Sequence, residues 1–441
     1  MMKRIALGLF ALMIFFQVSL ADAPFRNHRF DSLKVLPECS DSAIIFIGNS
    51  ITNMMEWNEL FGDRVEILNR GVSGAFTGEV LYNLDEMIKG TPKKVFLMIG
   101  TNDLGTEGKE NSPEKTAGRI GKILDRMREK WPETTIYYQS ILPSKRGLRT
   151  KKKTELTNAL VKKHIERMKS DRVRYLDIYN ALNDGDGGLK DTDMEGSPAA
   201  ISFDGLHLSQ RGYQIWADMI REVVGYEPVI PAGAQNLYGG LRKSEGMRAS
   251  YFGALPVKNT DILLIGDEMI HGGEWIELTG NPDFKDRGIG WGVPSVELSE
   301  IMSGIELMLN GNENFGVVKE TPRAVVLYGG LSDILNGKNS DIAAEDYGMV
   351  IDALRANLPD TPIYVMTVAP YPEKSEATAL EVKALNDHIR HFSEIIPGVV
   401  LIELEKALTT PKGTRDEDCF MGVYLSGKGY MKVAQVLNET F

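Results

Sequence analysis

Short apolar runs alternate with longer amphipathic stretches along most of this chain. The runs AIIFI, VEIL, VFLMI, TIYYQSI and RYLDI, all in the first half, have the length and continuous apolarity of strands buried on both faces. Between two of them, a stretch begins with Ser112 as N-cap and Pro113 as first helical residue, and it places Ile120 and Leu124 on one stripe. This alternation predicts an α/β fold, in which a parallel sheet carries helices on both faces.

The second half of the chain repeats the first. LPECSDSAIIFIGNSI (Leu36 to Ile51) is matched by LPVKNTDILLIGDEMI (Leu255 to Ile270), and NRGVSG, VFLMIGTNDL, QSILP and SFDGLHLSQRGY are matched in the same order by DRGIGW, VLYGGLSDI, MTVAP and CFMGVYLSGKGY. A repeat of this length indicates tandem duplication of a whole domain. We therefore expect one domain over 25–224 and a second over 241–441, joined by a linker over 225–240.

Composition narrows the classes of function. A chain of 441 residues is too long for one ordinary core, and its net charge of −11 argues against a nucleic-acid partner. The basic run KRGLRTKKK (Lys145 to Lys153) is interpreted as a solvated loop and helix start rather than a polyanion site. No CxxC or HExxH motif is present, so we expect neither a metal nor another cofactor.

The N-terminus has the pattern of a targeting segment. Lys3 and Arg4 precede a short apolar run that ends at Ser19-Leu20-Ala21, which predicts a signal peptide over 1–21 and export to the periplasm or the extracellular space. The run is too short to span a membrane well. The sequence leaves two alternatives open for its two cysteines, a disulfide or separate buried thiols, and it does not determine the oligomeric state.

Four segments of the first domain place polar or glycine residues just after a predicted strand or before the last helix. FIGNSIT puts Ser50 at the start of a helix, where backbone N–H groups can bind an anion. NRGVSG supplies Gly74, whose backbone can approach a ligand closely, and IGTND supplies the amide of Asn102. DGLHLS sets Asp204 just ahead of His207. Ligands of open parallel sheets bind at the carboxyl ends of the strands, so we expect these residues to meet there.

The ordered set satisfies a scheme of nucleophilic acyl transfer. A lone GxS could be a helix N-cap, a lone ND a turn, and a lone DxxH a surface pair. Together, Ser50 can attack, His207 can take its proton, and Asp204 can orient the imidazole. The backbone N–H groups of Ser50 and Gly74 and the amide of Asn102 are candidate donors to an oxyanion. Activity should fall on acidification, because protonated His207 cannot accept the serine proton.

The four blocks resemble those of the SGNH (GDSL-type) hydrolases. The resemblance spans roughly residues 36–222, and it implies two flavodoxin-like domains, each with a parallel sheet of about five strands. NRGVSG and GLHLSQRGY resemble in particular the platelet-activating-factor-acetylhydrolase-like and carbohydrate-esterase branches. The sequence departs from the family at Asn49, where aspartate is usual, and at Ala75, where relatives often carry aspartate. The resemblance assigns the triad to Ser50, His207 and Asp204, and the oxyanion hole to Ser50, Gly74 and Asn102.

The second domain keeps the apolar runs of the strands but lacks the candidate catalytic residues, which is typical of a pseudo-enzyme. An alternative is that Asp267, Glu268, His271 and Asp333 form a new site, even a metal site, although nothing in the sequence fixes their geometry. The loop from Asn183 to Gly196 also suggests calcium, but Leu189 stands where an EF-hand needs glycine. Ser50, Gly74, Asn102, Asp204 and His207 correspond in turn to Glu268, Trp291, Ser332, Met421 and Tyr424.

These features predict an exported serine esterase that removes short acyl groups, above all acetyl, from carbohydrate. The choice of substrate rests on the family resemblance and on the lack of a long apolar lid segment. Two alternatives remain, a lipid or lysophospholipid acylhydrolase and a non-catalytic glycan-binding protein. The pocket walls should come from loops such as Asn53 to Trp57 and Ser144 to Thr150.

Overall fold

The structure is a computed structural model, and it describes residues 26–193, 197, 199–229, 244–290, 294–310, 319–372 and 375–441. The expected signal peptide over 1–21 and most of the expected linker over 225–240 lie outside these residues. None of the helices in the described ranges has the length and apolarity that crossing a membrane requires.

The first copy contains a five-stranded parallel sheet and its surrounding helices. Residues 26–34 form a leading helix ahead of this sheet. The strands are β1 (Ile44–Gly48), β2 (Ile67–Gly71), β3 (Lys94–Met98), β4 (Thr135–Gln139) and β5 (Val173–Leu176). The other helices are α2 (Ser50–Asn53), α3 (Trp57–Leu60), α4 (Thr77–Met87), α5 (Thr101–Leu104), η1 (Lys109–Asn111), α6 (Pro113–Lys130), α7 (Lys151–Met168), α8 (Tyr179–Leu182) and α9 (Gln210–Val224).

The second copy repeats this plan and adds a short hairpin. Its strands are β6 (Ile262–Gly266), β7 (Phe284–Gly288), β8 (Ala324–Tyr328), β9 (Ile363–Met366), β10 (Val399–Ile402), β11 (Phe420–Met421) and β12 (Tyr424–Leu425). Its helices are α10 (Ser244–Gly253), α11 (Glu268–His271), α12 (Trp275–Thr279), α13 (Leu298–Asn310), α14 (Leu331–Leu335), α15 (Ser340–Asn357), α16 (Glu376–Ile395), α17 (Leu404–Ala407), η3 (Glu417–Cys419) and α18 (Gly427–Thr440).

The two sheets have one topology. The first runs β2-β1-β3-β4-β5 and the second β7-β6-β8-β9-β10, which is the flavodoxin-like order in both. The predicted fold class is therefore confirmed. Ser112 caps α6 as expected, its Oγ accepting the N–H of Lys115 at 3.3 Å. One boundary differs from the expectation, because β2 continues through Arg70 and Gly71, which pair with the last two residues of β1.

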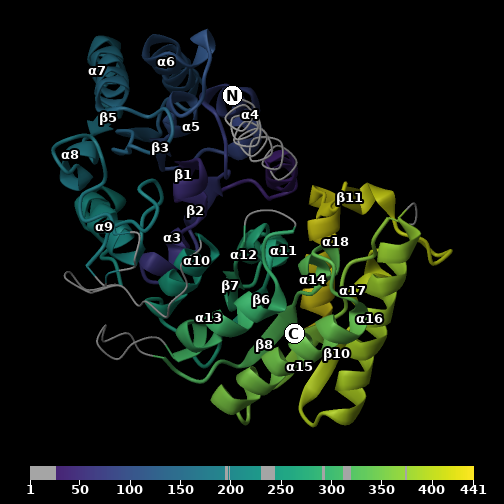
Figure 1. The fold of residues 1–441 in the computed structure, drawn as a ribbon. Coiled ribbons are helices and arrows are strands. Elements are labelled where there is room, and N and C mark those ends of the chain that lie inside the picture. Colours follow the sequence, from purple (N-terminus) through teal and green to yellow (C-terminus); the bar gives the residue numbers. More distant parts are fainter. Residues whose placement is uncertain are drawn as a thin grey trace, which may run out of the picture.

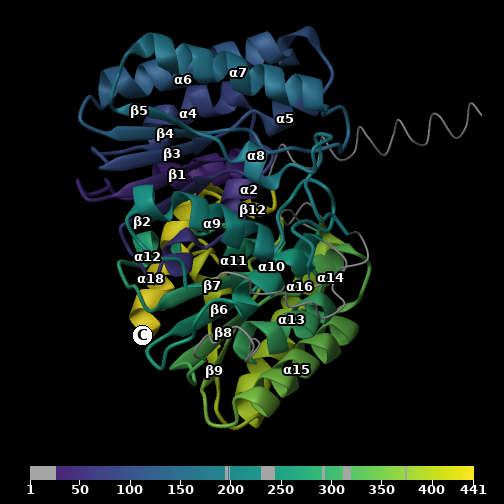
Figure 2. The ribbon, with the colours of Figure 1, turned by 90° about the vertical axis from the view of Figure 1, so that its left-hand side faces the viewer.

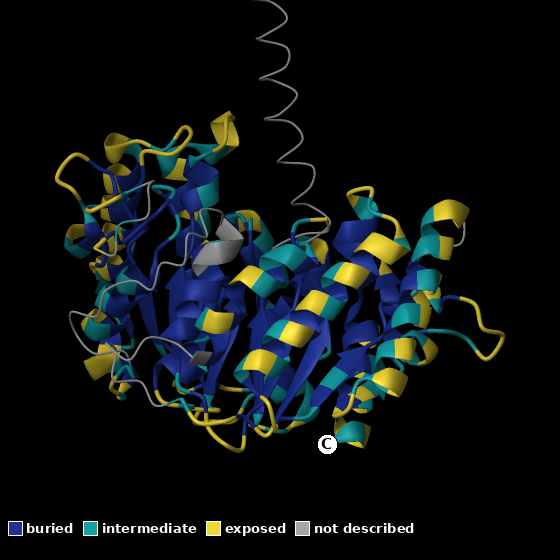
Figure 3. Ribbon diagram, turned by 60° about the horizontal axis from the view of Figure 1, so that its bottom comes forward, coloured by how far each residue is buried: buried dark blue, intermediate teal, exposed yellow. Residues whose placement is uncertain are grey.

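Helices cover both faces of each sheet (Figures 1 and 2). In Figure 2, α4, α6 and α7 form the outer layer of the first copy, while α2 and α9 lie on the side that faces the second copy. The central strands are mostly buried, the edge strands β5 and β10 are partly exposed, and the outer helices expose one stripe each (Figure 3). The buried apolar cluster beneath α9 continues without a break through α10 into the second copy, so the two copies share part of a core.

Reciprocal ion pairs join the copies. Arg70 on β2 donates two hydrogen bonds, of 2.7 and 2.6 Å, to Glu277 of the second copy. Arg287, the counterpart of Arg70 on β7, donates bonds of 2.9 and 2.7 Å to Glu59 of the first copy. The same contact is thus made twice with the copies exchanged, as at a two-fold interface between identical subunits.

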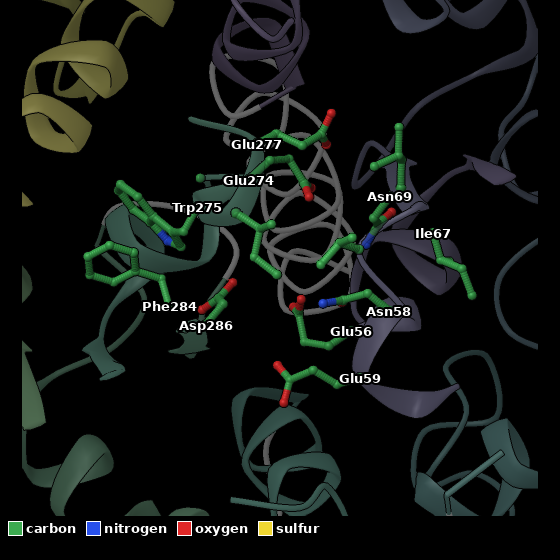
Figure 4. Close-up of a pocket in the computed structure, with 14 residues that line it drawn as sticks. Glu56, Asn58, Glu59, Ile67, Asn69, Glu274, Trp275, Glu277, Phe284 and Asp286 are labelled. Atoms are coloured by element: carbon green, nitrogen blue, oxygen red, sulfur yellow. The ribbon is translucent and has the colours of Figure 1, made fainter. Parts of the chain in front are cut away.

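A narrow crevice lies along this interface (Figure 4). Its acidic side chains point inward from both copies. Arginines of the opposite copy pair with four of them, and Arg248 also pairs with Asp286 of its own copy. Burial raises the pKa of Glu274 to about 7, and the charge of Arg29 opposes that rise. The crevice is therefore interpreted as part of the ion-pair interface. The four pairs are Arg248–Glu56, Arg287–Glu59, Arg29–Glu274 and Arg70–Glu277.

Candidate active site

The first copy gathers its candidate residues at one edge of its sheet. β2, β1 and β3 are adjacent parallel strands, so the residues that follow them lie along the same edge. Ser50 follows β1 as the first residue of α2, Gly74 lies in the turn after β2, and Asn102 lies in α5 after β3. The loop before α9 adds Asp204 and His207 to this edge.

Ser50, His207 and Asp204 form one continuous chain of hydrogen bonds. Ser50 Oγ lies 2.9 Å from His207 Nε2, and His207 Nδ1 lies 2.8 Å from Asp204 Oδ2. The His207 and Asp204 side chains are only 13% and 17% exposed, so they are largely shielded from water. This geometry permits transfer of the Ser50 proton to His207 and holds the imidazole from its other side.

Asn49 shapes the turn that presents Ser50. Its Oδ1 accepts the N–H of Ile51 at 3.0 Å, so α2 begins at Ser50. Asp267 does the same in the second copy, accepting the N–H of Met269 at 3.0 Å. Asparagine therefore caps this helix in the way an aspartate does. Asn49 Nδ2, which an aspartate would lack, has no hydrogen-bond partner within the described residues.

Asp204 is held as a carboxylate. Its Oδ1 accepts the N–H groups of Leu206 and His207 at 2.9 and 2.8 Å, and its Oδ2 meets both His207 and Arg146. Burial by itself raises the pKa of Asp204. The hydrogen bond and charge of His207, together with the two backbone N–H groups, outweigh burial and hold that pKa well below its ordinary value.

Gly74 and Asn102 meet at the turn after β2. Gly74 has a φ of 77°, a left-handed conformation that favours glycine. Asn102 Nδ2 donates to the carbonyl of Ala75 at 3.0 Å, which holds the amide beside this turn. The amide nitrogen carries two hydrogens, so one is left to face a ligand. The arrangement suits an oxyanion hole completed by the backbone N–H of Ser50.

Two arginines of the 144–150 loop support the site, and neither was assigned a role from the sequence. Arg149 is mostly buried, and it donates to Asn102 Oδ1 at 3.3 Å and to the carbonyl of Thr101 at 2.9 Å. Burial and the nearby charge of Arg146 lower the pKa of Arg149 to about 10. The basic run is therefore only partly solvated. Comparison of the two copies could have singled out these arginines, because the matching segment of the second copy, Pro370 to Glu376, contains no arginine.

The second copy has no nucleophile at the matching place. Glu268 occupies the position of Ser50, is buried, and accepts a hydrogen bond from Ser332 at 3.3 Å. Burial and the neighbouring carboxyl of Asp267 raise the pKa of Glu268 well above its ordinary value. Tyr424 replaces the base, and Trp291, the counterpart of Gly74, lies outside the described residues. Neither the hydroxyl of Ser50 nor the imidazole of His207 has a counterpart at these two positions, so the serine scheme cannot operate there.

The structure gives no support to a metal site at Asp267, Glu268, His271 and Asp333. Nowhere in the described ranges do three His, Cys, Asp or Glu side chains come together so that they could hold a metal ion. In the loop from Asn183, Asp184 instead forms an ion pair of 2.9 Å with Lys145. Both cysteines are free thiols, Cys39 half-buried and Cys419 buried.

Comparison with known proteins gives matches in both copies. The sequence model of the GDSL-like lipase/acylhydrolase family matches residues 46–215 and 301–432. Platelet-activating factor acetylhydrolase IB subunit alpha2 of Rattus norvegicus is 29% identical over 198 residues, which cover 42% of this chain and 79% of that protein.

Solved structures similar to this one include two bacterial proteins. A GDSL-like lipase from Bacteroides thetaiotaomicron VPI-5482 matches with a TM-score of 0.36 and 14% identity, covering 45% of this chain and 96% of the other. The lipase/acylhydrolase from Enterococcus faecalis matches with a TM-score of 0.33 and 14% identity, covering 41% of this chain and 94% of the other.

Proposed function

The chain belongs to the GDSL-like lipase/acylhydrolase family, and we propose that it is an exported serine esterase that removes short acyl groups, above all acetyl, from carbohydrate. The observation that carries the proposal is the hydrogen-bonded chain from Ser50 through His207 to Asp204. In this proposal the first domain, 25–224, is catalytic, and the second, 241–441, is not.

The proposed mechanism gives each of these residues a defined role. Ser50 Oγ attacks the ester carbonyl while His207 Nε2 takes the serine proton, and Asp204 stabilises the resulting imidazolium. The backbone N–H groups of Ser50 and Gly74 and the amide of Asn102 bind the oxyanion. His207 then gives the proton to the departing alcohol. A water molecule, deprotonated by the same imidazole, cleaves the acyl-serine and restores Ser50.

The names of the relatives say more about the acyl group that is removed than about the alcohol that carries it. The Rattus norvegicus protein is named for removing acetyl from platelet-activating factor, which supports acetyl as the group transferred. That name also favours the second candidate function, an acylhydrolase acting on lipid. The two candidates differ in the alcohol that leaves, so direct comparison of substrates separates them.

We expect kcat/KM for p-nitrophenyl esters to be highest for acetyl and to fall steadily toward octanoyl. Acetate release from acetylated glycans should then exceed release from platelet-activating factor at equal ester concentration. Colorimetric rates and an enzymatic acetate assay measure both quantities. A preference for octanoyl or longer esters would replace the carbohydrate proposal with the lipid one. The Ser50→Ala variant controls for spontaneous hydrolysis.

The pH dependence should show one ionisation on its acidic side. The depressed pKa of Asp204 means that this carboxylate stays charged at every pH above about 4, the ordinary aspartate value. Catalysis in this scheme needs a neutral imidazole, so log kcat/KM should decline by about one decade per pH unit on the acidic side. A limiting slope of two would show that Asp204 titrates in the same range. Samples returned to neutral pH before assay control for acid inactivation.

A further inference from the structure

The leading helix of the second copy, α10, lies between α9 of the first copy and α13 of its own (Figures 1 and 2). It carries Tyr251, a fully buried side chain. Tyr251 Oη donates a hydrogen bond of 2.5 Å to the carbonyl of Leu208, the residue directly after His207. A side chain of the second copy therefore holds the backbone that carries the base of the first.

A second tyrosine connects this contact to the nucleophile. Tyr213 on α9 packs edge-on against Tyr251, with their ring centroids 5.1 Å apart. Its Oη donates to the carbonyl of Ile51 at 2.6 Å, and Ile51 directly follows Ser50. The two tyrosines thus join the segment after Ser50 to the segment after His207.

Arg248, one turn earlier on α10, reaches the far end of the nucleophile helix. It donates to the carbonyl of Met54, the C-cap of α2. The same guanidinium is fixed within the second copy by the Gly288 carbonyl at 2.7 Å and Asp286 at 2.8 Å. The end of α2 is therefore fastened to the framework of the second sheet.

The reverse contact exists at the degenerate site, where no triad is present. Arg29, in the leading helix of the first copy, donates to the carbonyl of Gly272, the C-cap of α11, at 2.9 Å. Tyr430 Oη donates to the carbonyl of Met269 at 3.2 Å, as Tyr213 does to Ile51. The chain therefore contains an equivalent network beside a site without chemistry, which serves as an internal control.

We propose that α10 is a positioning element for the triad, with Tyr251 and Arg248 holding the base loop and the nucleophile helix in register. The inference rests on the proposed function and gives the second copy a part in it. Misplacing a reacting group by about 1 Å can lower a rate roughly 10²-fold, so small movements of either segment matter. Neither side chain touches the reacting atoms. The second copy thereby acts on kcat rather than on the choice of substrate.

The test is Tyr251→Phe in the full-length protein, which removes one hydroxyl and keeps the ring. We expect kcat for p-nitrophenyl acetate, and the rate of Ser50 labelling by a fluorophosphonate, to fall roughly tenfold with KM unchanged. The control is Tyr430→Phe, which removes a buried hydroxyl that donates to the backbone at the degenerate site, as Tyr213 does at the other site. A loss of stability alone would affect both variants, whereas a loss of kcat should be confined to Tyr251→Phe.

Arg248→Lys is the second variant, and it should also lower kcat. If folded Tyr251→Phe has the kcat of the wild type, the inference is wrong. If Tyr251→Phe does not fold, a wild-type kcat in folded Arg248→Lys overturns the inference instead. An equal loss of kcat in Tyr430→Phe overturns it as well. Failure of the wild type to react with the fluorophosphonate would instead refute the proposed esterase, so the two failures are distinguishable.

Discussion

Replacing Ser50 with alanine is expected to lower kcat for p-nitrophenyl acetate by about 10⁴- to 10⁶-fold. The reason is geometric. Ser50 Oγ lies 2.9 Å from His207 Nε2, so the substitution removes the hydroxyl that the base activates. The oxyanion donors remain in the variant, so a small residual rate over water should persist. Labelling by a fluorophosphonate probe should disappear along with turnover.

The matched control for this prediction is Glu268→Ala, the equivalent position of the second copy. It should leave kcat within about twofold, because Glu268 accepts its hydrogen bond from Ser332 of its own copy, whereas Ser50 bonds His207. Circular dichroism and the unfolding midpoint show whether either variant remains folded. Retention of turnover in Ser50→Ala, with loss in Glu268→Ala, would place the chemistry in the second copy. Unlabelled, folded wild type would favour the non-catalytic glycan-binding alternative.

The repeated strands and the order of the site blocks were predictable from the sequence. The apolar runs predicted all five strands of the first sheet, and self-comparison predicted the second sheet with the same topology. The end of β2 was missed because Arg70 and Gly71 look like turn residues, whereas Arg70 is satisfied by Glu277 of the other copy. The predicted end of β2 was therefore wrong, because the partner that allows a charged residue to lie in this buried strand is far away in the sequence.

The supporting contacts of the site could not be predicted. Which arginine of the basic run turns inward depends on the path of the 144–150 loop, and Arg149 and Arg146 differ in burial although they lie three positions apart. The contact from Tyr251 to Leu208 depends on how two domains are placed relative to each other. Periodicity describes the faces of single elements and contains no such information.

The second large effect concerns stability. We expect Arg287→Ala to lower the free energy of unfolding by about 3–5 kcal/mol, because it leaves the carboxylate of Glu59 buried without its partner. The side chains of Arg287 and Glu59 are 0% and 2% exposed, so water cannot solvate the remaining charge. Guanidinium unfolding, followed by tryptophan fluorescence and by esterase activity, measures the change. Loss of activity should coincide with the first fluorescence transition, since the pair joins the two copies.

Two controls separate the ion pair from general damage to the interface. Replacing both partners, Arg287→Met with Glu59→Leu, should recover most of the lost stability, because no unpaired charge is then buried. Arg172→Ala breaks a surface pair with Glu133, in which the side chains are 42% and 81% exposed, and should change stability by less than about 1 kcal/mol. A double variant as unstable as Arg287→Ala alone would show that the interface depends on the bonds of this pair rather than on avoiding an isolated charge. In either case, the sign of the coupling free energy between Arg287 and Glu59 shows whether their opposite charges stabilise the contact between the two copies.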